Sequence, residues 1–310
     1  MGHIAIRTEN LTRHFGGVRA VDDFSFDVPA GMIFGFLGPN GAGKTTMIRL
    51  LLGLLEPTTG RAAVLGFDAC RQSDEIRART GTLLEHTGLY ERLSAEENLE
   101  FYSRIWHLPA SERQSRIAAL LAHVGLSERR KERVGTWSRG MKQKLAVART
   151  LLHRPALIFL DEPTAGLDPV AAAALREDLA ALAAREGTTV FLTTHNLAEA
   201  ERLCEQVAII RQGKLLAIGR PDELRAGGAA PRVEIIGRGF DERLLTALRA
   251  RPEVAAVGIQ NDRLLVDLRR EVETAPLVGL VVGAGGQVEE VHKGKASLED
   301  VFLALMEEEQ

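Results

Sequence analysis

The pattern of apolar and polar residues divides most of the chain into the strands and helices of an α/β domain. Near the start, "IAIRTENLTRHF" and "VDDFSFDVPAG" alternate apolar with polar residues, as in an antiparallel sheet packed on one face. Further along, "MIFGFLG", "ALIFLDEP" and "TTVFLTTH" are short runs of apolar and β-branched residues, which are typical of buried parallel strands. Helical patterns separate these runs, so the chain as far as "QVAIIRQGKLLAIG" predicts a layered α/β domain.

A mostly helical segment interrupts this alternation at about residues 90–153. The stretch "SAEENLEFYSRIW" begins with Ser94, and Glu97 follows three residues later, which is the pattern of a capping box at a helix N-terminus. We therefore expect a helical subdomain inserted in the α/β domain.

The end of the chain predicts a second, smaller domain. The stretch "RAGGAAPR" is rich in glycine and proline and marks a linker at residues 226–231, after a first domain of residues 1–225. Beyond the linker, the apolar segments predict the order β-α-β-β-α-β-α, a small α+β domain over residues 232–310. Its role stays open between a stabilising module and a regulatory one.

Charge and composition exclude several classes of protein. The net charge is −3, and the tail is acidic, so nucleic acid is not an expected ligand. Two cysteines, Cys70 and Cys204, cannot make a disulfide framework, which favours a reducing, cytoplasmic environment. No export signal or lipid anchor is recognisable, and the longest apolar run, 275–286, is shorter than the roughly 20 residues of a spanning helix. We expect contact with a membrane only through a partner.

The strongest chemical signal is the loop "GPNGAGKTT", which follows an apolar strand and precedes the helix "TTMIRLLLGLL". The spacing of its glycines, lysine and threonine is that of a phosphate-binding loop. The glycines let backbone N–H groups turn toward phosphates, and we expect Lys44 to reach the β- and γ-phosphates and Thr45 to hold Mg²⁺. The predicted nucleotide-binding residues of the loop are Gly38, Pro39, Asn40, Gly41, Ala42, Gly43, Lys44, Thr45 and Thr46.

Two carboxylates end a second buried strand. "ALIFLDEP" places Asp161 and Glu162 at an exposed strand end, where adjacent carboxylates are costly unless a cation and a reacting water use them. Asp161 suits Mg²⁺, and Glu162 suits a general base for the attacking water. His195 ends another such strand and is a candidate for contact with the γ-phosphate from the side opposite Lys44. The predicted catalytic residues are therefore Glu162, His195 and Lys44.

Taken together, "GPNGAGKTT", "WSRGMKQKLAVARTLLHRPALIFLDEPTAGLDP" and "TTH" resemble, in this order, the nucleotide-binding subunits of ATP-binding cassette transporters. The resemblance covers roughly residues 4–225. It is specific because the loop, the signature turn, the carboxylate pair and the histidine occur together. It implies a phosphate-loop NTPase core of the RecA-like kind, with the antiparallel and helical subdomains expected above, and hydrolysis of ATP with Mg²⁺.

The resemblance also implies roles for residues outside the loop. In the family, the signature turn, here Ser138, Arg139 and Gly140, grips the γ-phosphate of ATP that is held by the loop of a second subunit. A serine hydroxyl and an unobstructed glycine N–H at a helix N-terminus suit an anion. By the same resemblance, Phe15 stacks on adenine, a contact without base-specific hydrogen bonds that also admits GTP, and Asp168 contacts the second subunit.

Two features depart from the commonest family pattern: the signature turn and the residue at position 85. The signature reads "WSRGM" where that pattern has Leu-Ser-Gly-Gly-Gln, so Arg139 and Met141 are substitutions. Glu85 occupies the position of a glutamine that contacts Mg²⁺ and senses the membrane subunit; a carboxylate binds Mg²⁺ but donates no hydrogen bond. With "HTGLYERLSAEENL" and "SLEDVFLAL", these changes resemble the daunorubicin-resistance-type branch of exporters.

The resemblance implies the ATPase subunit of a membrane exporter. Such a subunit works as a dimer, here expected to be a homodimer, with separately encoded transmembrane subunits at the cytoplasmic face of the cell membrane. The alternative is a soluble ABC-type ATPase of translation or DNA maintenance. Such proteins usually have two fused cassettes or a long coiled-coil insert between the loop and the signature turn. This chain has one phosphate loop, and residues 46–137 have no sustained heptads. A phosphate-loop kinase or GTPase is disfavoured because no Asn-Lys-x-Asp motif occurs.

Overall fold

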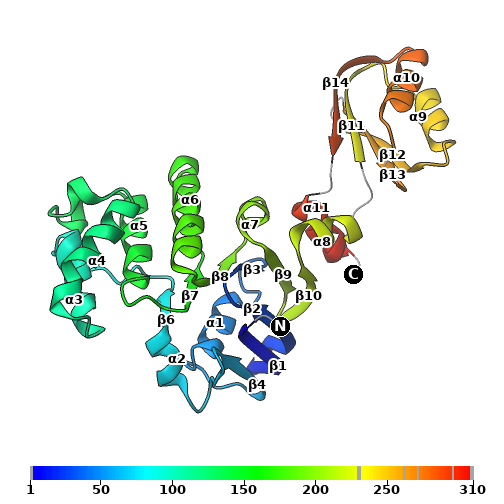
Figure 1. Ribbon diagram of the computed structural model, residues 1–310. Coiled ribbons are helices and arrows are strands. Elements are labelled where there is room, and N and C mark those ends of the chain that lie inside the picture. Colours follow the sequence, from blue (N-terminus) through cyan, green and yellow to red (C-terminus); the bar gives the residue numbers. More distant parts are fainter. Residues whose placement is uncertain (1–2, 229–231, 261–262, 271, 295–296, 308–310) are drawn as a thin grey trace. The chain divides into compact units, whose positions relative to one another are not determined.

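The computed structural model describes residues 3–228, 232–260, 263–270, 272–294 and 297–307 (Figure 1). Contacts between residues divide the chain into two compact units, Met1–Gly219 and Arg220–Gln310. Each unit has its own core of buried apolar side chains. Over the described ranges, no helix combines the length and the apolar character needed to cross a lipid bilayer.

The strands that alternate apolar and polar residues form an antiparallel sheet. Its strands, in the order β2-β1-β4-β5, are β1 (Ile4–Phe15), β2 (Val18–Pro29), β4 (Thr59–Val64) and β5 (Phe67–Asp68). In β2, Phe24, Phe26 and Val28 are buried, and the residues between them are exposed. This confirms the prediction of a sheet that is packed on one face.

The continuous apolar runs form the central sheet. Its strands, in the order β10-β9-β3-β8-β7-β6, are β3 (Ile33–Leu37), β6 (Thr80–Leu83), β7 (Leu157–Asp161), β8 (Thr189–Thr194), β9 (Gln206–Arg211) and β10 (Lys214–Gly219). Neighbouring strands are parallel except β9 and β10. Every residue of β3, β7 and β8 is buried, as expected for strands covered on both faces. The Phe26 and Phe34 rings stack with centroids 5.8 Å apart, so the two sheets share one core.

Helices connect and cover these strands. They are α1 (Lys44–Leu51), α2 (Ser73–Arg79), α3 (Ala95–Ile105), α4 (Ala110–His123), the short 3₁₀ helices η1 (Ser127–Arg129) and η2 (Val134–Thr136), α5 (Arg139–Thr150), α6 (Pro169–Glu186) and α7 (Leu197–Leu203). α3, α4 and α5 lie together at one side of this unit (Figure 1). They form the helical part predicted at residues 90–153. The expected capping box is present at the start of α3, where Ser94 and Glu97 bond reciprocally.

The second unit contains a four-stranded antiparallel sheet in the order β12-β13-β11-β14. Its elements are α8 (Pro221–Gly228), β11 (Arg232–Arg238), α9 (Glu242–Arg249), β12 (Val254–Gln260), β13 (Arg263–Leu268), α10 (Ala275–Gly283), β14 (Gln287–Gly294) and α11 (Leu298–Glu307). From β11 to β14 this is the β-α-β-β-α-β order of a ferredoxin-like motif. α9 and α10 bury apolar side chains such as Leu248 and Val281 against the sheet. The order from β11 to α11 is the predicted one.

The division between the units falls earlier than the expected domain boundary at residue 225. It lies between Gly219 and Arg220, because α8 packs against α11 and so belongs to the second unit. Residues 226–228, expected in the linker, form the last turn of α8, and residues 229–231 lie outside the described part of the chain. A glycine pair at a helix C-terminus resembles a linker in the sequence, because glycine is common in both.

Candidate functional site

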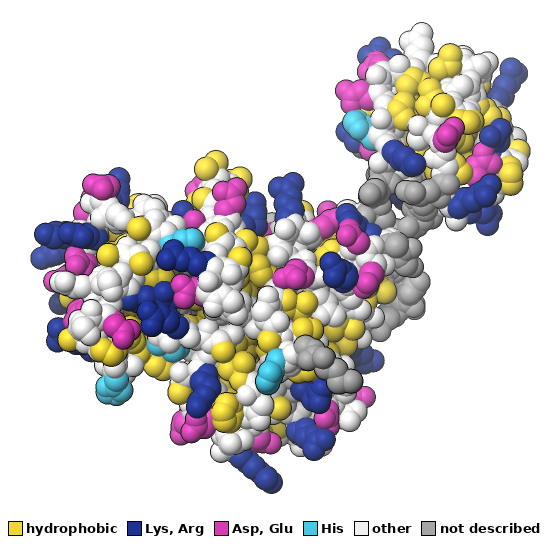
Figure 2. Space-filling view, in the orientation of Figure 1, with side chains coloured by type: hydrophobic (Ala, Val, Ile, Leu, Met, Phe, Trp, Pro, Cys, Tyr) yellow, Lys and Arg dark blue, Asp and Glu magenta, His cyan; other side chains and the backbone are white. Residues whose placement is uncertain are grey.

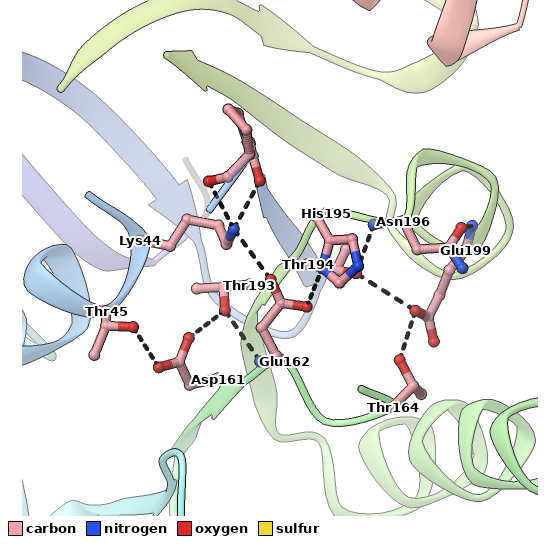
Figure 3. A network of polar contacts seen from close by, with 12 residues as sticks. Lys44, Thr45, Asp161, Glu162, Thr164, Thr193, Thr194, His195, Asn196 and Glu199 are labelled. Carbon is pink, nitrogen blue, oxygen red and sulfur yellow. Dashed lines mark hydrogen bonds and ion pairs between the residues drawn. The ribbon is translucent and has the colours of Figure 1, made fainter. Parts of the chain in front are cut away.

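Three loops meet at the carboxyl edge of the central sheet. They follow β3, β8 and β7, which are neighbours in the sheet. Parallel pairing sets Leu37 beside Thr194 and Asp161 beside Thr193, so the three strands end at one level. Loops at the carboxyl ends of adjacent parallel strands form the crevice in which α/β sheets bind ligands. The predicted residues that meet in this crevice are Lys44, Thr45, Asp161, Glu162 and His195 (Figure 3).

The loop after β3 requires glycine at position 43. Gly43 has a φ of 106°, in the left-handed region, and a Cβ atom there would lie 2.1 Å from the Ala20 carbonyl oxygen of β2. α1 begins at Lys44, so the free N–H groups and the positive end of its dipole face the loop. The residues that line the pocket at this place are Ala20, Asn40, Gly41, Gly43, Lys44, Thr45, Thr46, Glu85, Asp161 and Glu162.

Oxygen atoms surround the Lys44 ammonium group. The side chain is 6% exposed, and Nζ donates hydrogen bonds to the carbonyl oxygens of Gly38 at 2.7 Å and Pro39 at 3.1 Å. Nζ also lies 3.0 Å from Glu162 Oε1. A buried ammonium group needs such partners to offset the loss of water. They hold a positive charge at the base of the pocket.

Asp161 and Thr45 face each other in the same pocket. Thr45 Oγ1 donates a hydrogen bond to Asp161 Oδ2 at 2.6 Å, and Thr193 Oγ1 donates one to Asp161 Oδ1 at 2.5 Å. Asp161 is buried, whereas Glu85, the third predicted metal ligand, is exposed and lines the pocket. Mg²⁺ prefers oxygen ligands in proteins, so the hydroxyl and carboxylate donors of this group fit that ion.

Glu162 lies between Lys44 and His195. Its φ of 49° is in the left-handed region, which non-glycine residues seldom adopt, and its N–H is held by the carbonyl and hydroxyl oxygens of Thr193, each at 3.1 Å. Oε1 faces Lys44, and Oε2 lies 2.9 Å from Nδ1 of His195, whose side chain is 55% exposed. Each carboxylate oxygen is therefore oriented by a different side chain, Oε1 by Lys44 and Oε2 by His195.

The signature turn forms the N-terminus of α5. Ser138 is the N-cap residue, and its Oγ accepts a hydrogen bond from the Met141 N–H at 3.3 Å. A Cβ atom on Gly140 would lie 3.1 Å from the Ala171 Cβ atom of α6, so glycine lets α5 and α6 approach closely. Arg139 packs over Gly166, in the loop that leads to α6.

A second pocket lies beside this turn. Its lining residues are Glu85, His86, Thr87, Trp137, Arg139, Lys142 and Gln143, so Glu85 lines both pockets. The first turn of α5 carries no acidic residue. Figure 2 shows lysine and arginine side chains gathered over this part of the first unit, near α5 and β6. Glu85 brings a negative charge to the same lining, and Lys142 Nζ pairs with Glu91 Oε1 at 2.7 Å. The feature here that favours an anion is therefore the N-terminus of α5 itself.

The other predicted residues lie elsewhere on the first unit. Phe15 ends β1 and is 47% exposed, with the guanidinium carbon of Arg13 4.7 Å from its ring centroid. Asp168 is the N-cap of α6 and accepts hydrogen bonds from the N–H groups of Val170 and Ala171. Among the described residues, the lining of the Lys44 pocket includes neither Phe15 nor Asp168 nor the signature turn.

The network contains residues that the sequence pattern does not single out. Thr193 bonds to both Asp161 and Glu162, and Glu199 of α7 accepts a hydrogen bond from Thr164 Oγ1 at 2.7 Å. Hydroxyl residues in the buried strand "TTVFLTT" are a usable signal for Thr193, because a buried hydroxyl needs a partner. Glu199 has no such signal, since a glutamate in a first helical turn is ordinary.

Comparison with known proteins agrees with this geometry. Residues 21–165 match the ABC transporter family. The chain is 35% identical over 308 residues to the daunorubicin resistance ATP-binding protein DrrA3 of Streptomyces coeruleorubidus, which covers 98% of this chain and 96% of that protein. The chain belongs to the ATP-binding subunits of ABC transporters. The predicted family and its daunorubicin-resistance-type branch are confirmed.

This ABC subunit has further relatives. It is 43% identical over 211 residues to the bacitracin transport ATP-binding protein BcrA of Bacillus licheniformis, over 68% of each chain. The solved structure of cbiO1 from Clostridium perfringens, part of an ABC transporter complex, has a TM-score of 0.68 and 25% identity over 73% of this chain and 92% of that chain. The predicted fold class and ATPase activity are confirmed: the subunit hydrolyses ATP to energise transport through separate membrane subunits.

Proposed function

We propose that this ABC subunit energises the export of an antibiotic-like compound, as one half of a dimeric ATPase bound to membrane subunits at the cytoplasmic face. The names of two relatives, for daunorubicin resistance and bacitracin transport, support the class of compound. One observation carries the catalytic part of the proposal. Glu162 lies between Lys44 and His195 at the pocket, with a separate partner for each carboxylate oxygen.

Glu162 acts as the general base in this proposal. A γ-phosphate that enters the pocket attracts the Lys44 ammonium group more strongly than a single carboxylate does, because it carries more charge. Glu162 Oε1 is then released to accept a proton from the attacking water. Oε2 remains bonded to His195, which keeps the carboxylate in place. A base positioned in this way contributes about 10²–10⁴-fold to the rate.

Thr45 and Asp161 hold Mg²⁺ in this proposal, with Glu85 as a further ligand. The Thr45 hydroxyl and the Asp161 carboxylate are 2.6 Å apart and supply only oxygen donors. When bound, the ion neutralises charge that develops on the β- and γ-phosphate oxygens. Thr193 keeps the other Asp161 oxygen in place by its hydrogen bond of 2.5 Å.

The signature turn acts on the nucleotide of a second subunit. ABC ATP-binding subunits dimerise and work with membrane subunits. Ser138, Arg139 and Gly140 form an anion-favouring helix start, and they do not line the Lys44 pocket of their own chain within the described residues. In the proposed dimer this helix start meets the γ-phosphate held by the other chain. Asp168 lies in the same interface, next to Val170, whose apolar side chain is 79% exposed.

Phe15 stacks on the nucleotide base in this proposal. The ring is exposed at the end of β1, and β2 brings Ala20 of the same hairpin to the lining of the Lys44 pocket. Stacking provides affinity without reading the edge of the base. The site therefore accepts ATP and also GTP.

A reconstitution experiment tests this function. The neighbouring genes are searched for a hydrophobic membrane protein, and the subunit is co-expressed with it. ATP hydrolysis, co-purification and uptake of daunorubicin or bacitracin are then measured in inverted vesicles. We expect Mg²⁺-dependent hydrolysis that Lys44→Ala abolishes, and association with vesicles only when the membrane protein is present. Uptake that continues in the Lys44→Ala variant, or hydrolysis that persists in EDTA, would contradict the proposal.

A further inference from the structure

We propose that Glu199 is a positioning residue that links the loop after β7 to His195. Through this link, the surface that carries Asp168 is coupled to the residues at the γ-phosphate. The inference rests on the roles proposed above for Glu162 and His195. Glu199 itself touches neither the nucleotide nor the attacking water in this scheme, and it acts through its neighbours.

One oxygen of Glu199 joins two loops. The side chain lies in the first turn of α7 and is 3% exposed. Oε2 accepts a hydrogen bond from Thr164 Oγ1 at 2.7 Å and lies 3.5 Å from the Thr194 Oγ1 donor (Figure 3). Thr164 follows Glu162 by two residues, and Thr194 directly precedes His195. The loop that carries Glu162 and the loop that carries His195 therefore share one buried hydrogen-bond acceptor.

The start of α7 shows why this carboxylate is free to reach the loops. Glu199 is the third residue of the helix, and in a capping box its carboxylate would turn back to the N–H of the cap residue. Here the Asn196 N–H donates to Thr194 Oγ1 at 3.0 Å instead, and Asn196 Oδ1 accepts from the Glu199 N–H at 3.1 Å. The helix is capped without the Glu199 carboxylate, which bonds across to Thr164.

The second oxygen of Glu199 reaches the helix that follows the same loop. Arg176 Nη1 of α6 lies 3.6 Å from Oε1. Asp168 is the N-cap of α6, so Glu199 contacts both sides of the segment 164–168, at Thr164 and at the helix beyond Asp168. A buried carboxylate is costly unless several partners satisfy it. Among the described residues, Oε2 has hydrogen-bond partners in the two loops, and Oε1 has the Arg176 guanidinium of α6 as an ion-pair partner but accepts no hydrogen bond.

These contacts form a continuous connection from the Asp168 loop to the proposed base. A displacement of Thr164 changes the position of Glu199 and, through Thr194, that of His195. His195 Nδ1 is 2.9 Å from Glu162 Oε2, so the displacement reaches Glu162. Glu162, Thr164, His195 and Glu199 also line one pocket, together with the glycine and leucine of the intervening loop. Contact of the second subunit with Asp168 would act on the base by this route.

Thr164→Val tests the connection, because it removes the hydroxyl and keeps the side-chain volume. We expect kcat for ATP hydrolysis to fall about tenfold, the usual size of one hydrogen bond to a charged group, with KM for ATP unchanged within twofold. Glu199→Gln should lower kcat in the same way. Thr188→Val is the matched control: Thr188 Oγ1 is buried and donates to the Pro155 carbonyl oxygen at 3.1 Å, next to the other end of β8. It should leave kcat at the wild-type value with a similar melting temperature.

A double-mutant cycle separates positioning from a merely structural role. If Thr164 acts through His195, Thr164→Val causes no further loss in a His195→Ala background, measured by single-turnover hydrolysis. The inference is overturned if Thr164→Val matches Thr188→Val in kcat, or if its loss multiplies with that of His195→Ala. A wild-type kcat in His195→Ala alone shows instead that the proposed role of His195 is wrong, and the inference is overturned with it.

Discussion

Lys44 Nζ lies 3.0 Å from Glu162 Oε1, although one side chain follows β3 and the other follows β7. The two charges share a pocket in which both are largely shielded from water, at 6% and 20% exposure. Each charge therefore partly neutralises the other in the pocket where a nucleotide would bind. The order of the strands, and not their separation in the chain, produces this pair.

Replacement of Glu162 by glutamine should separate binding from hydrolysis. The variant keeps the shape of the side chain and removes the charge that holds Lys44, so the affinity for MgATP should be unchanged or higher. Turnover should fall by about 10²–10⁴-fold, because the water loses its base. Equilibrium binding and steady-state hydrolysis measure the two effects. Glu177→Gln, a change of charge on the exposed face of α6, serves as the control, and near wild-type turnover of Glu162→Gln would exclude Glu162 as the base.

Replacement of Glu85 by glutamine should alter coupling to the membrane subunits more than nucleotide binding. Glu85 is exposed and lines both the Lys44 pocket and the pocket beside Trp137. We expect less than a threefold change in ATP affinity and a changed stimulation of hydrolysis by the membrane partner in vesicles. Glu128→Gln in η1 provides a surface control. Unaltered stimulation would show that Glu85 is a solvated loop carboxylate without a role in coupling.

A mixed dimer should show that the signature turn acts in trans. Ser138→Asp keeps a good N-cap residue for α5 and adds a negative charge that repels a phosphate, and Ser138→Asn is the neutral control. Gly140 is a poorer test position because its Cβ atom would meet Ala171. A chain with Lys44→Ala and a chain with Ser138→Asp, both carrying Glu162→Gln, should together occlude up to one ATP per mixed dimer.

Each of these two variants alone should occlude almost no ATP, as measured by rapid filtration. The mixed dimer regains one pocket from the intact loop of one chain and the intact signature turn of the other. If occlusion does not rise on mixing, while a tag pull-down confirms the mixed dimer, then Ser138 does not act on the nucleotide of a second chain.

Truncation after Gly219 should leave a folded nucleotide-binding unit. Among the described residues, the buried cluster between the two sheets of this unit includes no residue beyond 219, and α8 packs against α11 in the second unit. We expect residues 1–219 to melt cooperatively and to bind ATP, whereas residues 1–228 should be less soluble because α8 loses its helix partner. Loss of a cooperative melt in the shorter fragment would show that the first unit needs the second to fold.

His153 should make the folded state less stable in mild acid. Its ring stacks on Trp106 with centroids 3.8 Å apart, and burial, with Arg116 nearby, lowers its pKa from 6.5 to about 4. Between these two pH values His153 is protonated in the unfolded chain but stays neutral in the folded chain. The free energy of unfolding therefore falls as the pH drops from about 6.5 toward 4. Urea midpoints at pH 7 and pH 5 should differ more for the wild type than for His153→Asn. Equal differences would contradict this origin of the acid sensitivity.

Local features of the protein follow from the sequence alone. Three such features are each contained in about ten consecutive residues: the capping box at Ser94, the phosphate loop that includes Lys44, and the buried strand that ends at Asp161. Their spacing is set by the backbone geometry of a single turn, helix or strand, which neighbouring side chains determine. For this reason the elements, and the residue types that gather at the candidate site, were predictable.

Only the tertiary structure decided which of these residues meet. The contacts of Glu162 with Lys44 and His195, and the link from Thr164 to Glu199, join segments that are distant in the chain. These contacts depend on strand order and register in the central sheet, which result from packing of the whole unit. The periodicity of apolar residues along the sequence does not reveal them. In the same way, α8 packs against α11, so the division between the units falls after Gly219. A local sequence pattern does not predict a contact between helices that are distant in the chain.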